Sequence, residues 1–144
     1  MQFSLFMAET RAQSAIFADL VQEFIETGNS FRFQARGRSM WPTIRDGEFL
    51  RVKPIGKRQL KLGDIVLFRR MGEFKAHRII GRKRDSVLIR GDACIDSDGW
   101  IAIPEILGRV VAAERGGDGR TFGSLERTWF FCHEAYRRLR TLKS

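Results

Sequence analysis

Cysteine and long apolar runs are both scarce in this chain. Its 144 residues include 2 cysteines, Cys94 and Cys132, which lie far apart and form no Cys-x-x-Cys pair. A disulfide framework is therefore not expected, and a reducing compartment fits best. No stretch approaches the roughly 18 apolar residues that cross a bilayer, and the segment from Met1 to Met7 is too short and too soon acidic for a signal peptide. We expect a soluble, cytoplasmic protein.

Metal-binding patterns are lacking as well. The 2 histidines and 2 cysteines have no paired spacing for a tetrahedral zinc site. Residues 96–99 (Asp-Ser-Asp-Gly) look like part of a calcium loop, but Cys94 would occupy the first ligand position and the closing glutamate is missing. We expect no metal and no cofactor.

Acidic residues are outnumbered by basic ones. The chain has 26 Lys and Arg against 17 Asp and Glu, which gives a formal net charge of +9 and a pI near 10.5. This balance suits an acidic peptide, an anionic membrane surface or nucleic acid, although charge describes association and not chemistry. Nucleic acid is the partner that we expect least.

The apolar content suffices for one hydrophobic core. With 43% hydrophobic residues, a single domain over residues 1–144 is expected. A 3.6-residue apolar period predicts an amphipathic helix over 8–26. A second amphipathic helix is predicted over 124–141, because apolar residues recur at helical spacing: Leu125, Trp129, Cys132, Tyr136 and Leu139. The other face of this helix suits solvent or anionic lipid headgroups, since it carries Arg127, Arg137, Arg138 and Arg140.

Between these helices, short β-type runs alternate with glycines. The strands are predicted at residues 31–34, 49–52, 65–68, 76–80, 87–90 and 108–111. Six short strands imply antiparallel pairing, so the fold class is mainly β with flanking helices, and the β-rich core covers 31–113. The segment 116–119 (Gly-Gly-Asp-Gly) is predicted to break this pattern before the second helix.

Residues 37–44 (Gly-Arg-Ser-Met-Trp-Pro-Thr-Ile) place a serine in a stiff turn. Gly37 permits almost any φ, and Pro42 fixes its own φ and restricts Trp41. Ser39 is therefore a nucleophile candidate in a short, exposed segment. By itself it could equally be an ordinary turn residue.

Several segments together resemble, in order, the boxes of type I signal peptidases and of the related LexA-type self-cleaving repressors, which are serine peptidases of the S24/S26 type. They are residues 37–44 with Asp46-Gly47, then Gly63-Asp64-Ile65-Val66, then His77-Arg78-Ile79-Ile80-Gly81, then Gly91-Asp92. The match covers roughly residues 36–111, and its ordered boxes are more specific than one short motif. It implies a coiled, antiparallel β-sheet domain and a serine peptidase activity.

The resemblance implies that Ser39 is the nucleophile and that His77 is its base. A serine hydroxyl needs a base within hydrogen-bond reach. Bacterial signal peptidases and the repressors have a lysine at this position, whereas histidine stands there in the endoplasmic-reticulum and archaeal signal peptidases. A histidine base predicts that activity falls below about pH 6 to 7. The second histidine, His133, has no predicted role.

A histidine base also needs a carboxylate to hold its tautomer. The segment 91–99 offers three aspartates. In the histidine-type relatives a required aspartate follows the Gly-Asp box by six residues, which here is Asp98. We expect Asp98 to orient His77, with Asp92 as second choice and Asp96 as third, the last more simply an aspartate of a polar turn.

The chain departs from its relatives beside the nucleophile. The resemblance implies an oxyanion site made of backbone donors, for which the Ser39 amide is the natural candidate. Many signal peptidases carry a serine two residues before the nucleophile and a glycine directly before it, where this chain has Gly37 and Arg38. Neither a hydroxyl donor nor the usual small-residue cleavage preference is therefore implied.

The leading functional hypothesis is a cytoplasmic Ser/His/Asp endopeptidase without a membrane anchor that cleaves an extended peptide or leader segment bound at a strand edge. Two alternatives stay open. One is a non-catalytic β module that binds peptide, anionic membrane or nucleic acid through its basic surface. The other is a self-cleaving regulator, although no obvious Ala-Gly or Cys-Gly cut site lies in a linker.

Overall fold

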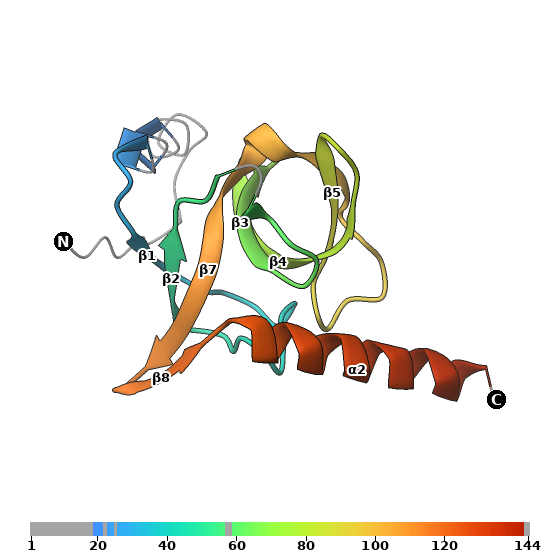
Figure 1. Ribbon diagram of the computed structural model, residues 1–144. Coiled ribbons are helices and arrows are strands. Elements are labelled where there is room, and N and C mark those ends of the chain that lie inside the picture. The colour runs from blue at the N-terminus through green and yellow to red at the C-terminus, as the bar shows by residue number, and fades with distance from the viewer. Residues whose placement is uncertain (1–18, 22, 25, 57–58, 143–144) are drawn as a thin grey trace.

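The computed structural model describes residues 19–21, 23–24, 26–56 and 59–142 (Figure 1). Eight strands follow one another before the C-terminal helix: β1 (Phe31–Gln34), β2 (Phe49–Lys53), β3 (Ile65–Arg70), β4 (Glu73–Arg82), β5 (Ser86–Arg90), β6 (Gly99–Ala102), β7 (Ile106–Arg115) and β8 (Asp118–Thr121). A short 3₁₀ helix, η2 (Ile103–Glu105), joins β6 to β7, and α2 (Ser124–Thr141) follows β8. The predicted class, mainly antiparallel β with a C-terminal helix, is confirmed.

The strands form one antiparallel sheet in the order β1-β2-β7-β3-β4-β5-β6, with β8 paired to β7. All six predicted strands are present, and β4 and β7 are longer than predicted. Strands β6 and β8 were not predicted from the sequence. Strand β8 escaped prediction because its four side chains are all exposed and polar or absent, so they show no apolar alternation. The glycines before it form the β7–β8 hairpin turn, with positive φ at Gly116 and Gly117.

Strand β3 lies at the centre of the sheet and separates two apolar clusters. Ile65 and Leu67 point into one cluster with β1, β2 and β7, while Val66 and Phe68 point into the other with β4 and β5. All four side chains are almost completely buried. A continuous apolar run is what a strand covered on both faces requires, and Figure 1 shows the sheet coiling around this region.

The predicted N-terminal helix over 8–26 falls mostly outside the described residues. Of its C-terminal part, residues 19–21, 23–24 and 26 are helical. Val21 is buried in the cluster on the β1 side of the sheet, and the Phe24 ring packs edge-on against Phe31 with centroids 6.5 Å apart. This end of the helix therefore covers β1.

The C-terminal helix α2 contacts the sheet mainly through charged side chains. Its ion pairs are Glu126 with Arg78, Arg127 with Asp64 and Glu134 with Arg90. Among the side chains that the structure describes, Phe130 is buried at 5% exposure and Phe131 lies beside Gly63. Arg127, which the sequence analysis assigned to a solvent or lipid-facing surface, is thus an internal ion-pair partner. Within the described part of the chain, no helix is both long and apolar enough to span a lipid bilayer.

Candidate active site

Ser39 lies in the loop between β1 and β2, and side-chain hydrogen bonds hold this loop in shape. The backbone ladder continues past β1 through Ala35, whose amide donates to the Glu48 carbonyl. At Gly37 the chain turns with φ of 86°, and the Gly37 amide donates to Asp46 Oδ1 at 2.7 Å. A left-handed φ explains why glycine stands two residues before the serine.

Two apolar side chains anchor the loop on the sheet. Met40 and Ile44 are 4% and 3% exposed and belong to the cluster on the β1 side. Between them, the Thr43 hydroxyl donates to Asp92 Oδ2 at 2.6 Å. The residues on either side of the Trp41–Pro42 pair are therefore fixed, and Ser39 is positioned by buried neighbours.

Glu48 is a further support of this loop that the sequence analysis did not identify. Its buried carboxylate accepts hydrogen bonds from the Arg45 amide and from Arg120, which also donates to the Thr43 carbonyl. Burial raises the pKa of Glu48, but these hydrogen bonds and the two arginine charges lower it by more, so the pKa lies below its usual value. Only the fold brings Arg120 of β8 to this carboxylate.

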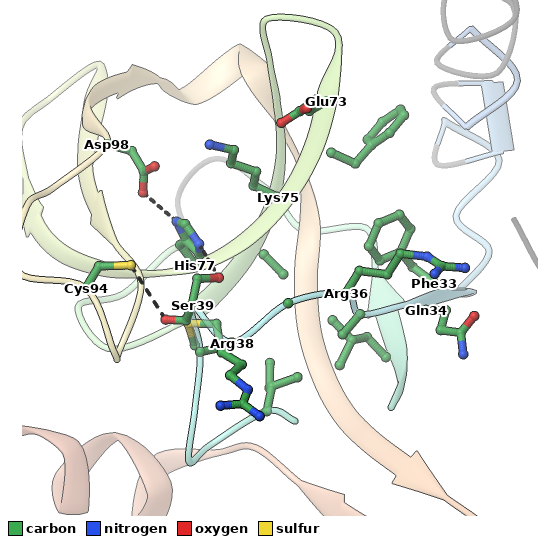
Figure 2. Close-up of a pocket in the computed structure, with 17 residues that line it drawn as sticks. Phe33, Gln34, Arg36, Arg38, Ser39, Glu73, Lys75, His77, Cys94 and Asp98 are labelled. Atoms are coloured by element: carbon green, nitrogen blue, oxygen red, sulfur yellow. Dashed lines mark hydrogen bonds and ion pairs between the residues drawn. The ribbon is translucent and has the colours of Figure 1, made fainter. Parts of the chain in front are cut away.

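His77 projects from β4 toward the serine (Figure 2). Its Nε2 lies 2.9 Å from Ser39 Oγ, within hydrogen-bond distance. The imidazole is 6% exposed and packs against the Phe68 ring, with ring centroids 6.0 Å apart. This packing restricts the ring to one orientation, with Nε2 toward Ser39.

The other ring nitrogen of His77 contacts Asp98. The distance from Nδ1 to Asp98 Oδ2 is 2.5 Å, and Figure 2 shows the three side chains in a row. The Asp98 amide donates to the Ile89 carbonyl, which fixes the carboxylate at the start of β6. The structure therefore brings together Ser39, His77 and the first-choice aspartate.

The second- and third-choice aspartates lie elsewhere. Asp92 accepts two hydrogen bonds from Arg78, from Nε at 2.9 Å and Nη2 at 2.7 Å, so it does not orient His77. Side chains alternate between the two faces along a strand. Arg78 therefore points to the face of β4 opposite to His77, and Asp92 lies on the Arg78 side. Asp96 is exposed in the turn. Burial lowers the pKa of Arg78, and Asp92 and Glu126 raise it by more, so the guanidinium pKa lies above its usual value.

The turn at 91–94 closes against Ser39. The Ala93 amide donates to the Ser39 carbonyl at 2.9 Å, and the Asp92 amide donates to Met40 Sδ. A Cβ at Gly91 would lie 2.6 Å from the Ser39 carbonyl oxygen and 3.2 Å from His77 Nε2. Only glycine fits here without moving the reactive pair. Gly91 and Asp92 thus hold the loop of Ser39 in place by close packing and hydrogen bonds, and we assign them no part in proton transfer.

A cavity of about 500 Å³ opens beside Ser39 and His77. Figure 2 shows its residues coming from the β1 end and following loop on one side and from β4 on the other. Besides Asp98, its charged lining residues are Arg36, Arg38, Glu73 and Lys75, and its apolar lining residues are Phe33, Ala35, Met40, Ile44, Leu50, Phe74 and Ala76. A reactive pair at the wall of a largely apolar cleft is the usual arrangement of a binding site.

This geometry can perform nucleophilic catalysis. A hydroxyl, an imidazole and a carboxylate stand in hydrogen-bond contact in that order, which is the arrangement of a serine nucleophile with an oriented base. Comparison with known proteins found no match among curated proteins. A family model described as Peptidase S24-like matches residues 4–92, which contain both Ser39 and His77. The chain therefore belongs to the Peptidase S24-like family.

Proposed function

We propose that this chain is a serine endopeptidase. The observation that carries the proposal is the continuous contact from Ser39 Oγ to His77 Nε2 and from His77 Nδ1 to Asp98. A histidine in place of the lysine further supports a relation to the histidine-type signal peptidases. Asp98 and the Phe68 ring together hold the imidazole in the orientation that a base requires.

The chemistry follows from these contacts. Ser39 Oγ attacks the peptide carbonyl carbon while His77 Nε2 takes its proton. The C–N bond then breaks, and the same nitrogen gives the proton to the leaving amine, which leaves an acyl ester on Ser39. Water attacks this ester while His77 Nε2 takes its proton. The bond between the acyl carbon and Ser39 Oγ then breaks, the acid product leaves, and His77 returns the proton to Ser39 Oγ. Asp98 stabilises the imidazolium that forms in both halves. The Ser39 amide is the proposed oxyanion donor.

Two strand edges beside the cavity suit an extended substrate. Residues 73–77 of β4 pair with β3, whereas β5 pairs with β4 over Arg78–Arg82, so no described strand covers the other edge of 73–77. Strand β1 lies at the end of the sheet order. A peptide between these edges could pair with backbone groups and direct alternate side chains into the cavity. We therefore propose a peptide or leader segment bound as a strand.

The apolar cavity wall predicts a preference for a large apolar residue next to the cleaved bond. Replacing Ala76 by isoleucine would add three methyl or methylene groups to that wall. We expect kcat/KM to fall at least about tenfold for a peptide with leucine at the acyl side, and much less for one with alanine. Steady-state kinetics on the two peptides measure this, with Ala102→Ile on the exposed face of β6 as control. An unchanged leucine-to-alanine ratio would show that the side chain binds elsewhere.

A serine-directed fluorophosphonate probe tests the proposed function itself. It should label the wild-type chain and Ser30→Ala, an exposed serine far from the site, but not Ser39→Ala or His77→Ala. Absence of labelling in the wild type, together with salt-sensitive binding to peptide or vesicles, would indicate the non-catalytic alternative. A Ser39-dependent cut in the chain itself at neutral pH would indicate self-cleavage. Labelling that persists in Ser39→Ala would refute the assignment of Ser39 as the nucleophile.

A further inference from the structure

Helix α2 turns its apolar side away from the sheet. The residues that bind the body are Glu126, Arg127, Phe130 and Glu134. On the opposite side Tyr136 is 59% exposed, Leu139 62% and Leu142 82%. Cys132 is exposed as well, whereas Phe131 lies beside Gly63 and, with Ala135, lines a groove next to Ile80 and Arg90 of the sheet. This is the reverse of an ordinary surface helix, which buries its apolar stripe.

The exposed apolar residues form one continuous sector. Successive residues of an α-helix are rotated by about 100°, so Leu139 and Leu142 lie side by side with Cys132 and Tyr136. We call these four residues the outer face of α2. Figure 1 shows that the C-terminal turns of α2 extend beyond the strands, where no other described element covers them.

Arginines border the outer face on both sides. The same rotation of about 100° per residue places Arg138 at one border and Arg140 at the other. Both are exposed, and the Arg140 guanidinium lies 5.9 Å from the Tyr136 ring centroid. Glu134, the acidic residue of this half of the helix, is engaged by Arg90 at 2.9 Å. The outer face is therefore apolar at its centre and positive at its borders.

This charge pattern selects among the partners that an apolar face could have. A second copy of the chain would bring Arg138 and Arg140 against their own counterparts, with no acidic residue on that face to pair with them. Nucleic acid would use the arginines but would leave the leucines unburied. An anionic bilayer satisfies both parts, because acyl chains receive the apolar centre while lipid phosphates receive the guanidinium borders.

We propose that the outer face of α2 docks the protein on an anionic membrane surface, with the helix axis in the plane of the headgroups. The helix does not cross the bilayer, because its inner side stays ion-paired to Arg78, Asp64 and Arg90. The proposal does not depend on peptidase activity, since none of the four residues lines the cavity beside Ser39.

Co-sedimentation of the full chain with vesicles tests this docking. Wild-type protein should bind vesicles of phosphatidylcholine with phosphatidylglycerol at least tenfold more tightly than pure phosphatidylcholine vesicles, and 0.5 M salt should weaken the binding. The double variant Tyr136→Asp/Leu139→Asp should lose at least tenfold, and Arg138→Glu/Arg140→Glu should lose the preference for the anionic lipid. Met71→Asp is the matched control, because Met71 is 95% exposed on the β3–β4 turn. Thermal unfolding checks that each variant is folded.

Four results would overturn the proposal. One is equal binding, or equal absence of binding, to the two vesicle types. Another is loss of binding in Met71→Asp as large as in the double variant. A third is a concentration-dependent dimer that Tyr136→Asp/Leu139→Asp abolishes, which would assign the outer face to a second copy. The fourth is DNA binding that needs the same two apolar residues.

Discussion

Asp98→Asn is expected to lower kcat by about 10³- to 10⁴-fold while KM changes little. The carboxylate accepts the proton of His77 Nδ1, which leaves Nε2 free to take the proton of Ser39. An asparagine amide can instead donate to Nδ1, and the ring then carries its proton on Nε2, the wrong nitrogen for a base. Asp98 lines the cavity, but asparagine has nearly the same size and shape, so substrate binding should be preserved. Steady-state kinetics on a cleaved peptide separate kcat from KM.

Asp96→Asn is the matched control for this variant. It makes the same chemical change in the same turn, but Asp96 is exposed and does not contact His77. Its kcat should stay within about twofold of wild type, as for most surface changes. Equal losses in the two variants would mean that the turn as a whole matters and that Asp98 does not orient the base. Retention of more than one tenth of kcat by Asp98→Asn would have the same meaning.

Arg78→Met is expected to lower the free energy of unfolding by about 3 to 5 kcal/mol, a large part of the stability of a small protein. The Arg78 guanidinium is fully buried. It donates to the Gly63 carbonyl, to Asp92 and to Glu126, and it stacks 4.3 Å from the Phe130 ring centroid. Without it, the carboxylate of Asp92, which is 6% exposed, stays buried without its counterion.

Urea unfolding at neutral pH measures this loss. Arg84→Met, an exposed arginine in the β4–β5 turn, should change the unfolding free energy by no more than about 0.5 kcal/mol. The double variant Arg78→Met/Asp92→Asn should be more stable than Arg78→Met alone, because it removes the uncompensated charge. If Arg78→Met unfolds at the wild-type urea concentration, the buried ion pair is not what joins α2 and the 91–94 turn to the sheet.

Much of the strand content could be read from local patterns. Alternating and continuous apolar runs predicted β1 to β5 and β7, because burial of one or both faces of a strand constrains each side chain independently. Strand β8 could not be predicted in this way. Its register is set by pairing with β7, and Gly119 and Arg120 carry no apolar signal of their own.

The candidate site could be predicted only in part, and from ordered motifs instead of apolar periodicity. The ordered boxes indicated Ser39 and His77, and counting along the chain favoured Asp98, but the sequence alone left Asp92 and Asp96 as alternatives. Tertiary structure separates them, because the turn at 91–99 directs Asp98 to His77 and leaves Asp92 opposite Arg78. It also assigns a role to Gly37, whose positive φ lets the chain enter the loop that carries Ser39.

What the sequence determined by itself is the kind of each element, because helix and strand periods are local properties of the chain. Which way the elements face is a property of the whole fold. The apolar period of α2 was readable at Cys132, Tyr136 and Leu139, yet their direction depended on where Arg78, Asp64 and Arg90 stand on the sheet. Those partners bind the charged side of the helix, and the apolar side is consequently turned outward.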